Sequence, residues 1–246
     1  SGAYTGAALL STAACLRAGA GLTTAAIPGA VKQAFSALPE AMAIAVNDGA
    51  DWDTAACEQA LALLPQKNAV CIGCGVGAGN ILPLMEAMLA ARVPLVLDAD
   101  ALNQLSQSQP LFAQLRKNVI LTPHPAEMAR LIGEPIANVL ADPIEISRTF
   151  ARRWNCVVLL KGATTCISDG TQVRLNTSGN AGLAKGGSGD VLAGLITGLL
   201  AQGIAPMEAA SCGAYLLGAS ADVALDLLKE RMLLARDVVD AVEQTI

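Results

Sequence analysis

Short, fully apolar runs that alternate with helical stretches constrain this chain most. VPLVL (residues 93–97) and CVVLL (residues 156–160) carry no polar side chain, as strands do that are buried on both faces of a sheet. Alternation of such runs with helical patterns is typical of βαβ units in a mostly parallel sheet. Strands are expected at Leu22–Ile27, Met42–Val46, Ala69–Ile72, Leu95–Leu97, Val119–Leu121, Val157–Leu160, Thr165–Ser168 and Val173–Asn176. Helices are expected at 5–19, 53–64, 80–91, 100–107, 125–132, 142–154, 188–202, 206–228 and 235–246.

The alternation runs through all 246 residues without a linker, a low-complexity tract or an internal repeat, so we expect a single α/β domain, 1–246. The chain opens on a loop-like stretch, SGAYTGAA, with no strand before its first helix. In a βαβ fold a helix at that place would follow a strand. We therefore expect the domain to lack its first strand in this sequence.

Composition limits the partners and the compartment. The chain is 53% hydrophobic and 15% charged, which suits a large aliphatic core, yet no apolar run reaches the roughly 18 to 20 residues of a membrane span. The first residues lack the charged start of a secretory signal. Seven cysteines without framework spacing favour a reducing, cytoplasmic location. The net charge of −5 excludes a broad basic surface, so we expect neither nucleic acid nor a membrane as partner.

The glycine-rich stretch GCGVGAGN (residues 73–80) follows an expected strand and precedes a helix. Gly73, Gly75 and Ala78 match the dinucleotide-binding fingerprint, and Asp98 ends the next strand. The fingerprint usually opens its domain, whereas two expected strands come before this one. A Rossmann site and a plain turn stay open, and we favour another ligand-lining loop.

Four polar or thiol side chains near this stretch have two interpretations each. Cys71 and Cys74 form a C-x-x-C, but no second pair exists, so burial as small apolar residues is favoured over a metal site. In LDADALN (residues 97–103), Asp100 could cap the following helix. Asp98 could contact a hydrated Mg²⁺ or substrate hydroxyls at the strand end where ligands gather.

Two further strand ends carry ligand candidates. LTPHPAE (residues 121–127) holds the only histidine, His124, in a turn at a strand's carboxyl end, which favours ligand contact. LLKGATT (residues 159–165) ends a strand with Lys161, a glycine and two hydroxyls. This group could contact a nucleotide or form a plain β-turn between two strands.

The stretch NAGLAKGGSGDVLAG (residues 180–194) leads into an apolar helix. Gly186, Gly187 and Gly189 let the backbone turn and expose N–H groups at the positive end of that helix, which makes an anion site. No Gly-Lys-Ser/Thr follows, so it is not a Walker A loop. Asp190 could be a helix cap. Three glycines favour a second interpretation, in which the N–H groups hold a phosphoryl group and Asp190 deprotonates the attacking hydroxyl.

Together, NAGLAKGGSGDVLAG, VLDADALN, LTPHPAEMARL and LLKGAT resemble, in the same order, the ribokinase-like family of NAD(P)H-hydrate dehydratases, and YTGAALLSTAACLRAGAGL resembles that family's first helix. The resemblance implies a three-layer α/β/α sandwich with a mostly parallel central sheet. It also implies a repair reaction, in which a nucleotide phosphorylates the C6 hydroxyl of (6S)-hydrated NADH or NADPH and phosphate is then eliminated. The histidine of TPHPAE is the bacterial-type form, which favours ADP, with AMP as product, over ATP; Mg²⁺ is the implied metal, with no ligands assigned.

Carried over by position, the resemblance implies roles for individual residues. Asp190 would be the base that meets the hydrate hydroxyl, and Ala7, Gly77 and His124 would contact the hydrated dinucleotide. The nucleotide would contact Lys161, Gly162, Ala163, Thr164, Thr165, Gly187, Ser188 and Gly189. The resemblance further implies a homo-oligomer, such as a tetramer, and an NAD(P)H-hydrate epimerase, fused or separate.

One residue departs from the family pattern, and three other functions remain open. Lys185 stands where the family usually has a small or hydroxylated residue, so it could contact phosphate or point to solvent. A hydroxyethylthiazole kinase-like enzyme would leave a phosphorylated product. A Rossmann oxidoreductase would bind NAD through Gly73–Ala78 without needing Asp190, and a non-catalytic nucleotide sensor would tolerate its loss.

Overall fold

A six-stranded sheet forms the centre of the molecule. The computed structural model describes residues 1–226 and 228–245. The strands cross the sheet in chain order, with β3 to β6 parallel and β7 and β8 antiparallel at one edge. Their bounds are β3 (Val70–Ile72), β4 (Leu95–Leu97), β5 (Val119–Leu121), β6 (Val157–Leu160), β7 (Thr165–Ser168) and β8 (Val173–Asn176).

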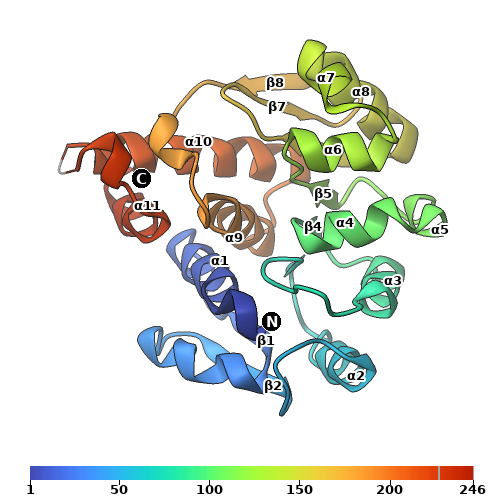
Figure 1. Cartoon of the computed structure of the whole chain (residues 1–246), viewed down its shortest axis with the longest axis vertical. Coiled ribbons are helices and arrows are strands. Elements are labelled where there is room, and N and C mark those ends of the chain that lie inside the picture. The colour runs from blue at the N-terminus through green and yellow to red at the C-terminus, as the bar shows by residue number, and fades with distance from the viewer. Residues whose placement is uncertain (227, 246) are drawn as a thin grey trace.

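Helices cover both faces of this sheet (Figure 1). One face is covered by α1 (Thr5–Arg17), α9 (Ser188–Ala201), α10 (Pro206–Ala224) and α11 (Ala235–Ala241). The other is covered by α2 (Thr54–Ala62), α3 (Leu82–Ala91), α4 (Asp100–Ser106), α5 (Gln109–Phe112), α6 (Pro125–Ile132), α7 (Ile136–Ala141) and α8 (Pro143–Trp154).

The side chains of the inner strands alternate between the two faces. In β4, Leu95 and Leu97 pack in the apolar cluster of α2, α3 and α4, whereas Val96 packs in the cluster of α1, α9 and α10. All three are fully buried, because helices cover both faces, and this is why the runs are apolar throughout. The expected three-layer α/β/α architecture with a mostly parallel sheet is confirmed.

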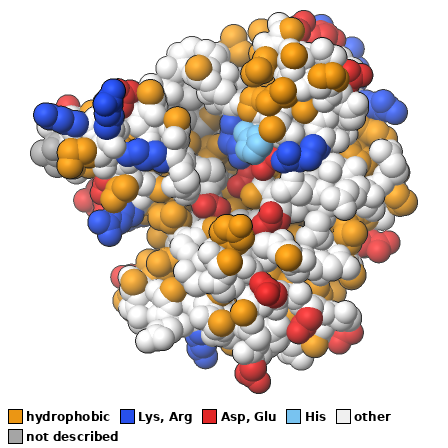
Figure 2. Space-filling model, in the orientation of Figure 1, with side chains coloured by type: hydrophobic (Ala, Val, Ile, Leu, Met, Phe, Trp, Pro, Cys, Tyr) orange, Lys and Arg blue, Asp and Glu red, His pale blue; other side chains and the backbone are white. Residues whose placement is uncertain are grey.

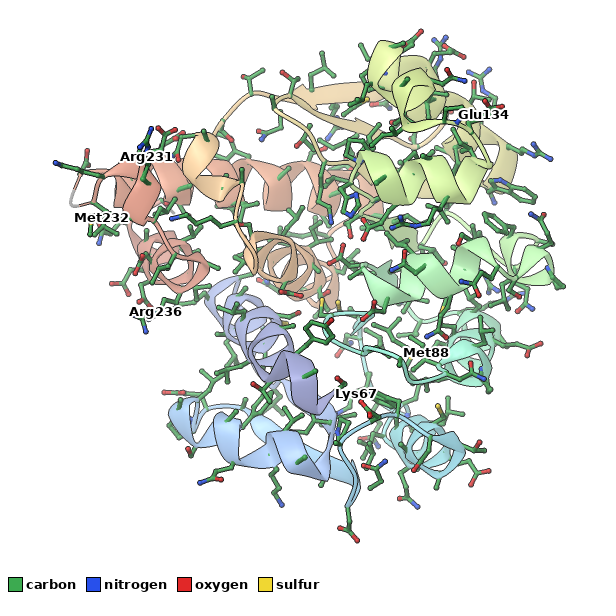
Figure 3. The ribbon with its side chains drawn as sticks, in the orientation of Figure 1. Lys67, Met88, Glu134, Arg231, Met232 and Arg236 are labelled. Atoms are coloured by element: carbon green, nitrogen blue, oxygen red, sulfur yellow. The ribbon has the colours of Figure 1, made fainter. Side chains whose placement is uncertain are left out.

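All eight expected strands are present, but the first two form a sheet of their own. β1 (Thr24–Pro28) begins two residues later than expected and pairs in parallel with β2 (Met42–Asn47). A cavity of about 680 Å³ separates the edge of β1 from the edge of β3, and α1 and α3 also line it. At one end Lys67 Nζ donates to Thr24 Oγ1 at 2.9 Å; Figure 3 labels Lys67 and Met88, two of the lining residues. The gap contrasts with the continuous sheet that regular βαβ alternation predicts.

Several helix boundaries differ from the expected ones. The helix expected at 206–228 ends at Ala224, and residue 227 lies outside the described residues. The helix expected at 235–246 ends at Ala241 and continues as a 3-10 turn, Val242–Gln244; residue 246 again lies outside. Helices α5 and α7 and the 3-10 segment Gly29–Ala37 were not expected, since α5 and α7 are too short to show a helical period.

Helices α1 and α9 approach closely because two glycines face α1. A Cβ on Gly194 would overlap the carbonyl oxygen of Ser11, and one on Gly198 would lie 2.6 Å from the carbonyl oxygen of Cys15. The contact fixes the beginning of α9, and so the glycine loop before it, against the N-terminal helix.

Two further properties follow from the described residues. None of their helices is both long and apolar enough to cross a membrane. Their seven cysteines are all free thiols, and Cys212 is the exposed one.

Candidate active site

Most of the expected ligand residues line one cavity of about 890 Å³ at the carboxyl ends of β4, β5 and β6. Figure 2 shows the hollow, with the histidine between basic side chains and acidic groups just below it. The expected residues on its wall are Lys161, Gly162, Ala163, Thr165, His124, Gly187, Ser188, Gly189 and Asp190. Thr164, Ala7 and Gly77 are not among its lining residues.

The glycine loop presents the beginning of α9 to this cavity. Gly187 is the N-cap residue, with a φ of 98° that suits glycine, and no side chain caps the helix. The first-turn N–H groups of an uncapped helix lack intrahelical partners, so those of Gly189 and Asp190 can hold an anion. A Cβ on Gly186 would meet nothing within 4 Å, so this glycine is not required by space.

Asp190 is not the cap of its helix, because Gly187 occupies that position. Its carboxylate instead lies beside Asp98 and Cys74, and one ligand atom from each of the three lies within 4.8 Å of the others. Burial and repulsion by Asp98 raise the pKa of Asp190 to about 6. A carboxylate with that pKa is ionised at pH 7 and still basic enough to accept a proton.

Asp98 is the centre of a buried charged network. It is 2% exposed, and its Oδ1 accepts from Thr122 Oγ1 at 2.7 Å and from Lys161 Nζ at 2.9 Å. Lys161 Nζ also lies 3.8 Å from Oε2 of the buried Glu127. Burial lowers the pKa of Lys161, but the carboxylates of Asp98 and Glu127 outweigh it and the pKa is raised. Lys161 therefore stays charged, because each buried charge has a partner.

The glycines of the 73–80 turn serve close packing. A Cβ on Gly73 would overlap the backbone oxygen of Asp98, and one on Gly75 would lie 2.8 Å from the Cβ of Ala7. Asp100 does not cap α4, since Ala99 is the N-cap residue; its Oδ2 accepts from the N–H of Gly77 at 2.8 Å. Gly77 thus lies on a turn that Asp100 holds by a hydrogen bond, and Ala7 of α1 packs against the same turn.

Ala99 carries backbone strain at this junction. Its φ of 47° and ψ of −115° are unusual for a residue with a side chain. Such strain persists only where surrounding contacts over-determine it, and it is frequent at functional sites. Here it turns the chain sharply between the two aspartates.

His124 caps α6 while it faces the cavity. Its Nδ1 accepts from the N–H groups of Ala126 and Glu127 at 3.1 and 3.2 Å, and the backbone N–H of His124 donates to Glu127 Oε2 at 2.8 Å. Burial lowers the pKa of His124, an effect that the Glu127 carboxylate opposes. The imidazole is therefore neutral at pH 7 and carries its proton on Nε2.

Lys185 lies on the cavity wall, and its ammonium group is held by backbone carbonyl oxygens. Its Nζ donates to the carbonyl oxygens of Arg231 and Leu233 at 2.5 and 2.7 Å, so the ammonium does not simply point to solvent, and its contact with phosphate stays a prediction. Figure 3 shows Arg231 and Met232 at the outer tip of the segment that this lysine holds. The ammonium fixes the 231–233 segment to the glycine loop.

Sequence reasoning missed polar residues on the cavity wall. They are Glu127, Asn176, Ser178 and Asn180. The spacing of Glu127 from His124 suits a capping box, and this is the signal that could have placed Glu127 beside the histidine. Nothing in the local pattern of Asn176 and Ser178 indicates a cavity.

Comparison with known proteins gives a consistent result. A model of the NAD(P)H-hydrate dehydratase family matches residues 1–243. The bifunctional NAD(P)H-hydrate repair enzyme Nnr of Moorella thermoacetica is 40% identical over 249 residues, which cover 96% of this chain and 46% of that protein. The ADP-dependent (S)-NAD(P)H-hydrate dehydratase of Neisseria meningitidis serogroup B is 43% identical over 215 residues, 85% of this chain and 68% of that one.

A solved structure of a dehydratase is similar to this chain over its whole length. The ADP/ATP-dependent NAD(P)H-hydrate dehydratase of Bacillus subtilis, co-crystallised with ATP/Mg²⁺, superposes with a TM-score of 0.83 at 30% identity, over 100% of this chain and 85% of that one. The chain spans about half the length of the bifunctional relatives that it matches.

Proposed function

The chain belongs to the NAD(P)H-hydrate dehydratase family, and we propose that it catalyses the ADP-dependent dehydration of (6S)-NAD(P)H hydrate to NAD(P)H, with release of AMP and phosphate. One observation carries the proposal for this chain. Asp190, a half-buried carboxylate whose pKa is raised to about 6, lies in the first turn of an uncapped helix at the wall of a cavity. That is the pairing of base and anion site that phosphoryl transfer to a hydroxyl requires.

The proposed chemistry has two steps. Asp190 takes the proton of the C6 hydroxyl, whose oxygen attacks the β-phosphorus of ADP while the bond to the AMP oxygen breaks. The N–H groups of Gly189 and Asp190 hold the charge on the transferred group. The C6–O bond then breaks as phosphate leaves, and loss of a proton from the neighbouring carbon restores the ring double bond.

Mg²⁺ would neutralise phosphate charge when bound, and the residues fit it in part. Asp98, whose Oδ2 is not taken by Thr122 or Lys161, offers a carboxylate oxygen of the kind that Mg²⁺ prefers alongside phosphate oxygens. Lys161, held by Asp98, lies at the same wall and would contact the nucleotide.

The test is restoration of NADH from its hydrate. We expect absorbance of NADH to return when the protein is mixed with hydrated NADH, Mg²⁺ and ADP, and to return more slowly with ATP. A stable phosphorylated product instead of NADH would indicate the small-alcohol kinase alternative. No turnover with either nucleotide would overturn the proposal.

Nucleotide binding should depend on Lys161 and Gly187. Lys161→Ala removes the cation at the strand end, and Gly187→Val adds a Cβ 2.8 Å from Ala235 and Leu10 at a residue with positive φ. We expect calorimetry to show weaker ADP and AMP binding in both. Gly186→Ala, whose Cβ meets nothing within 4 Å, is the matched control and should bind like the parent. Unchanged affinity in both test variants would place the nucleotide elsewhere.

His124 should serve the hydrate and not the nucleotide. We expect His124→Ala to raise KM for the hydrate about ten- to a hundredfold, since a lost charge-assisted bond costs roughly 1.5 to 3 kcal/mol. Calorimetry should show ADP affinity little changed. Because His124 also caps α6, His124→Asn is the control that keeps a capping side chain. Weakened ADP binding with an unchanged KM would reverse the assignment.

We also propose that a further parallel strand, continuous with Ser1, fills the cavity between β1 and β3. The edges of both strands line it, and the Ser1 amino group donates to the Gly75 oxygen just past the end of β3. A six-residue apolar, β-branched extension before Ser1 should raise the unfolding midpoint by roughly 2 to 4 °C per kcal/mol gained. A Gly/Ser extension of equal length should leave it unchanged; equal effects of the two extensions would contradict the strand.

We also propose a partner enzyme and an oligomeric state for this chain. An NAD(P)H-hydrate epimerase, fused or separate, would supply the 6S form, since the hydrate's hydroxyl must face Asp190. We propose a homo-oligomer, such as a tetramer, which light scattering would test.

A further inference from the structure

A thiol stands among the two carboxylates of the candidate active site. Cys74 Sγ lies 3.9 Å from Asp98 Oδ2, and a ligand atom of Asp190 lies within 4.8 Å of both. Thr122 and Lys161 occupy Asp98 Oδ1 and leave Oδ2 for the cluster. Each of the three side chains therefore presents one electron-pair donor to a common point.

The space around this point is kept open by glycine. A Cβ on Gly189 would lie in van der Waals contact with Asp98 Oδ2 at 3.6 Å and Lys161 Nζ at 3.4 Å, so a side chain longer than alanine would compete for the space of the cluster. Asp98 and Asp190 also line the cavity, which gives a bound ion one coordination position toward solvent or ligand.

The thiol does not suit the metal that the family implies. Mg²⁺ is a hard cation that takes oxygen ligands in octahedral geometry, and it gains nothing from sulfur. One thiolate and two carboxylates instead match the three protein ligands and open fourth position of a tetrahedral Zn²⁺ site. Zinc–ligand bonds of about 2.0 to 2.3 Å would require the three donor atoms to move closer to one another by about 1 Å.

We propose that Cys74, Asp98 and Asp190 form a binding site for a thiophilic divalent cation, Zn²⁺, Cd²⁺ or Co²⁺, and that its binding withdraws Asp190 from the reaction. The Cys74 thiol loses its proton to solvent as the metal–sulfur bond forms, and no oxidant is involved. The contact with Cys71 and burial raise the pKa of Cys74, so the thiol is protonated until a cation arrives. The inhibition rests on the proposed function; the site itself does not.

Cobalt spectroscopy tests the site without using activity. The background variant is Cys212→Ser, which removes the exposed thiol. We expect one equivalent of Co²⁺ to give a thiolate-to-cobalt charge-transfer band, and Zn²⁺ to abolish it. Cys74→Ser should lose the band, whereas Cys71→Ser, changed 3.9 Å away, should keep it. Thermal unfolding of each variant establishes that it is folded. Absence of the band in the background protein, or its persistence in Cys74→Ser, overturns the proposal.

Inhibition tests the consequence. Zn²⁺ should inhibit NADH restoration, and Cys74→Ser should raise the half-inhibiting concentration at least about tenfold, because losing even an outer partner of a metal site typically costs that much. Each variant is compared with its own rate in chelator-treated buffer containing Mg²⁺. Equal half-inhibiting concentrations of Zn²⁺ for the parent and Cys74→Ser would overturn the proposal that metal binding at this site takes Asp190 out of the reaction. Should the chain lack dehydratase activity, the cobalt band still decides the site, so the two failures are distinguishable.

Discussion

Asp190→Asn should lower turnover of hydrated NADH about 10²- to 10⁴-fold while ADP affinity stays close to that of the parent. The amide keeps the size of the side chain and leaves the N–H groups at the beginning of α9 in place, but it cannot accept the hydroxyl proton. Initial rates of NADH restoration and calorimetry on the same preparation measure both quantities. Near-normal turnover would reduce Asp190 to a favourable charge in a helix first turn.

Asp190→Asn should also change the pH dependence of kcat/KM. Because the pKa of Asp190 is raised to about 6, kcat/KM of the parent should fall as pH drops below 6, and the variant should lack this dependence.

The raised pKa of Asp190 also affects stability: the ionised carboxylate destabilises the fold, and this destabilisation grows as pH rises through about 6. We expect Asp190→Asn to be more stable at pH 7 by about 1 to 3 kcal/mol, a difference that vanishes near pH 3. A less stable variant at pH 7 would contradict this.

Gly194→Ala should destabilise the protein by about 1 to 3 kcal/mol or more, the usual range for overpacking. Alanine has a higher helix propensity than glycine, so a loss of stability must come from the contact between α1 and α9 and not from propensity. The added methyl would overlap the backbone oxygen of Ser11, which cannot rotate away, and α1 would have to move. Urea unfolding measures the free energy directly.

Gly6→Ala is the matched control for that experiment. Gly6 lies in α1, and a Cβ there would meet nothing within 4 Å. The same substitution should therefore be neutral or stabilising by up to about 1 kcal/mol. Similar free energies of unfolding for the two variants would show that α1 and α9 tolerate a wider spacing.

Sequence predicted the sheet well because burial dictates its residues. The side chains of β4 and β6 must face helices on both sides, so their runs hold only apolar residues and are visible without a structure. Helices α5 and α7 escaped notice, since four and six residues are too few for a helical period. The cavity between β1 and β3 escaped as well, because pairing between strands leaves no mark on local sequence.

The candidate site was predictable in its members but not in its contacts. Lys161, His124 and the glycine loop could be located at strand ends, where ligands gather. Their partners are far apart in the chain: Lys161 binds Asp98, and Lys185 binds the 231–233 carbonyl oxygens. The partner of Asp100 is also distant in the chain. An aspartate at the beginning of a helix suggests a cap, whereas Asp100 accepts from the N–H of Gly77.

The packing of α1 on α9 has a consequence for the order in which the chain folds. Strands β3 to β8 neighbour one another in the order of synthesis, so each can pair as it leaves the ribosome. Helix α1 is made before all of these strands, yet the glycine face that receives Ser11 is made after all of them. Closing so long a loop is slow, and until it closes the apolar face of α1 is exposed to chaperones and to other nascent chains. The Gly75 turn rests on Ala7 of α1, so this turn reaches its final position only when α1 docks.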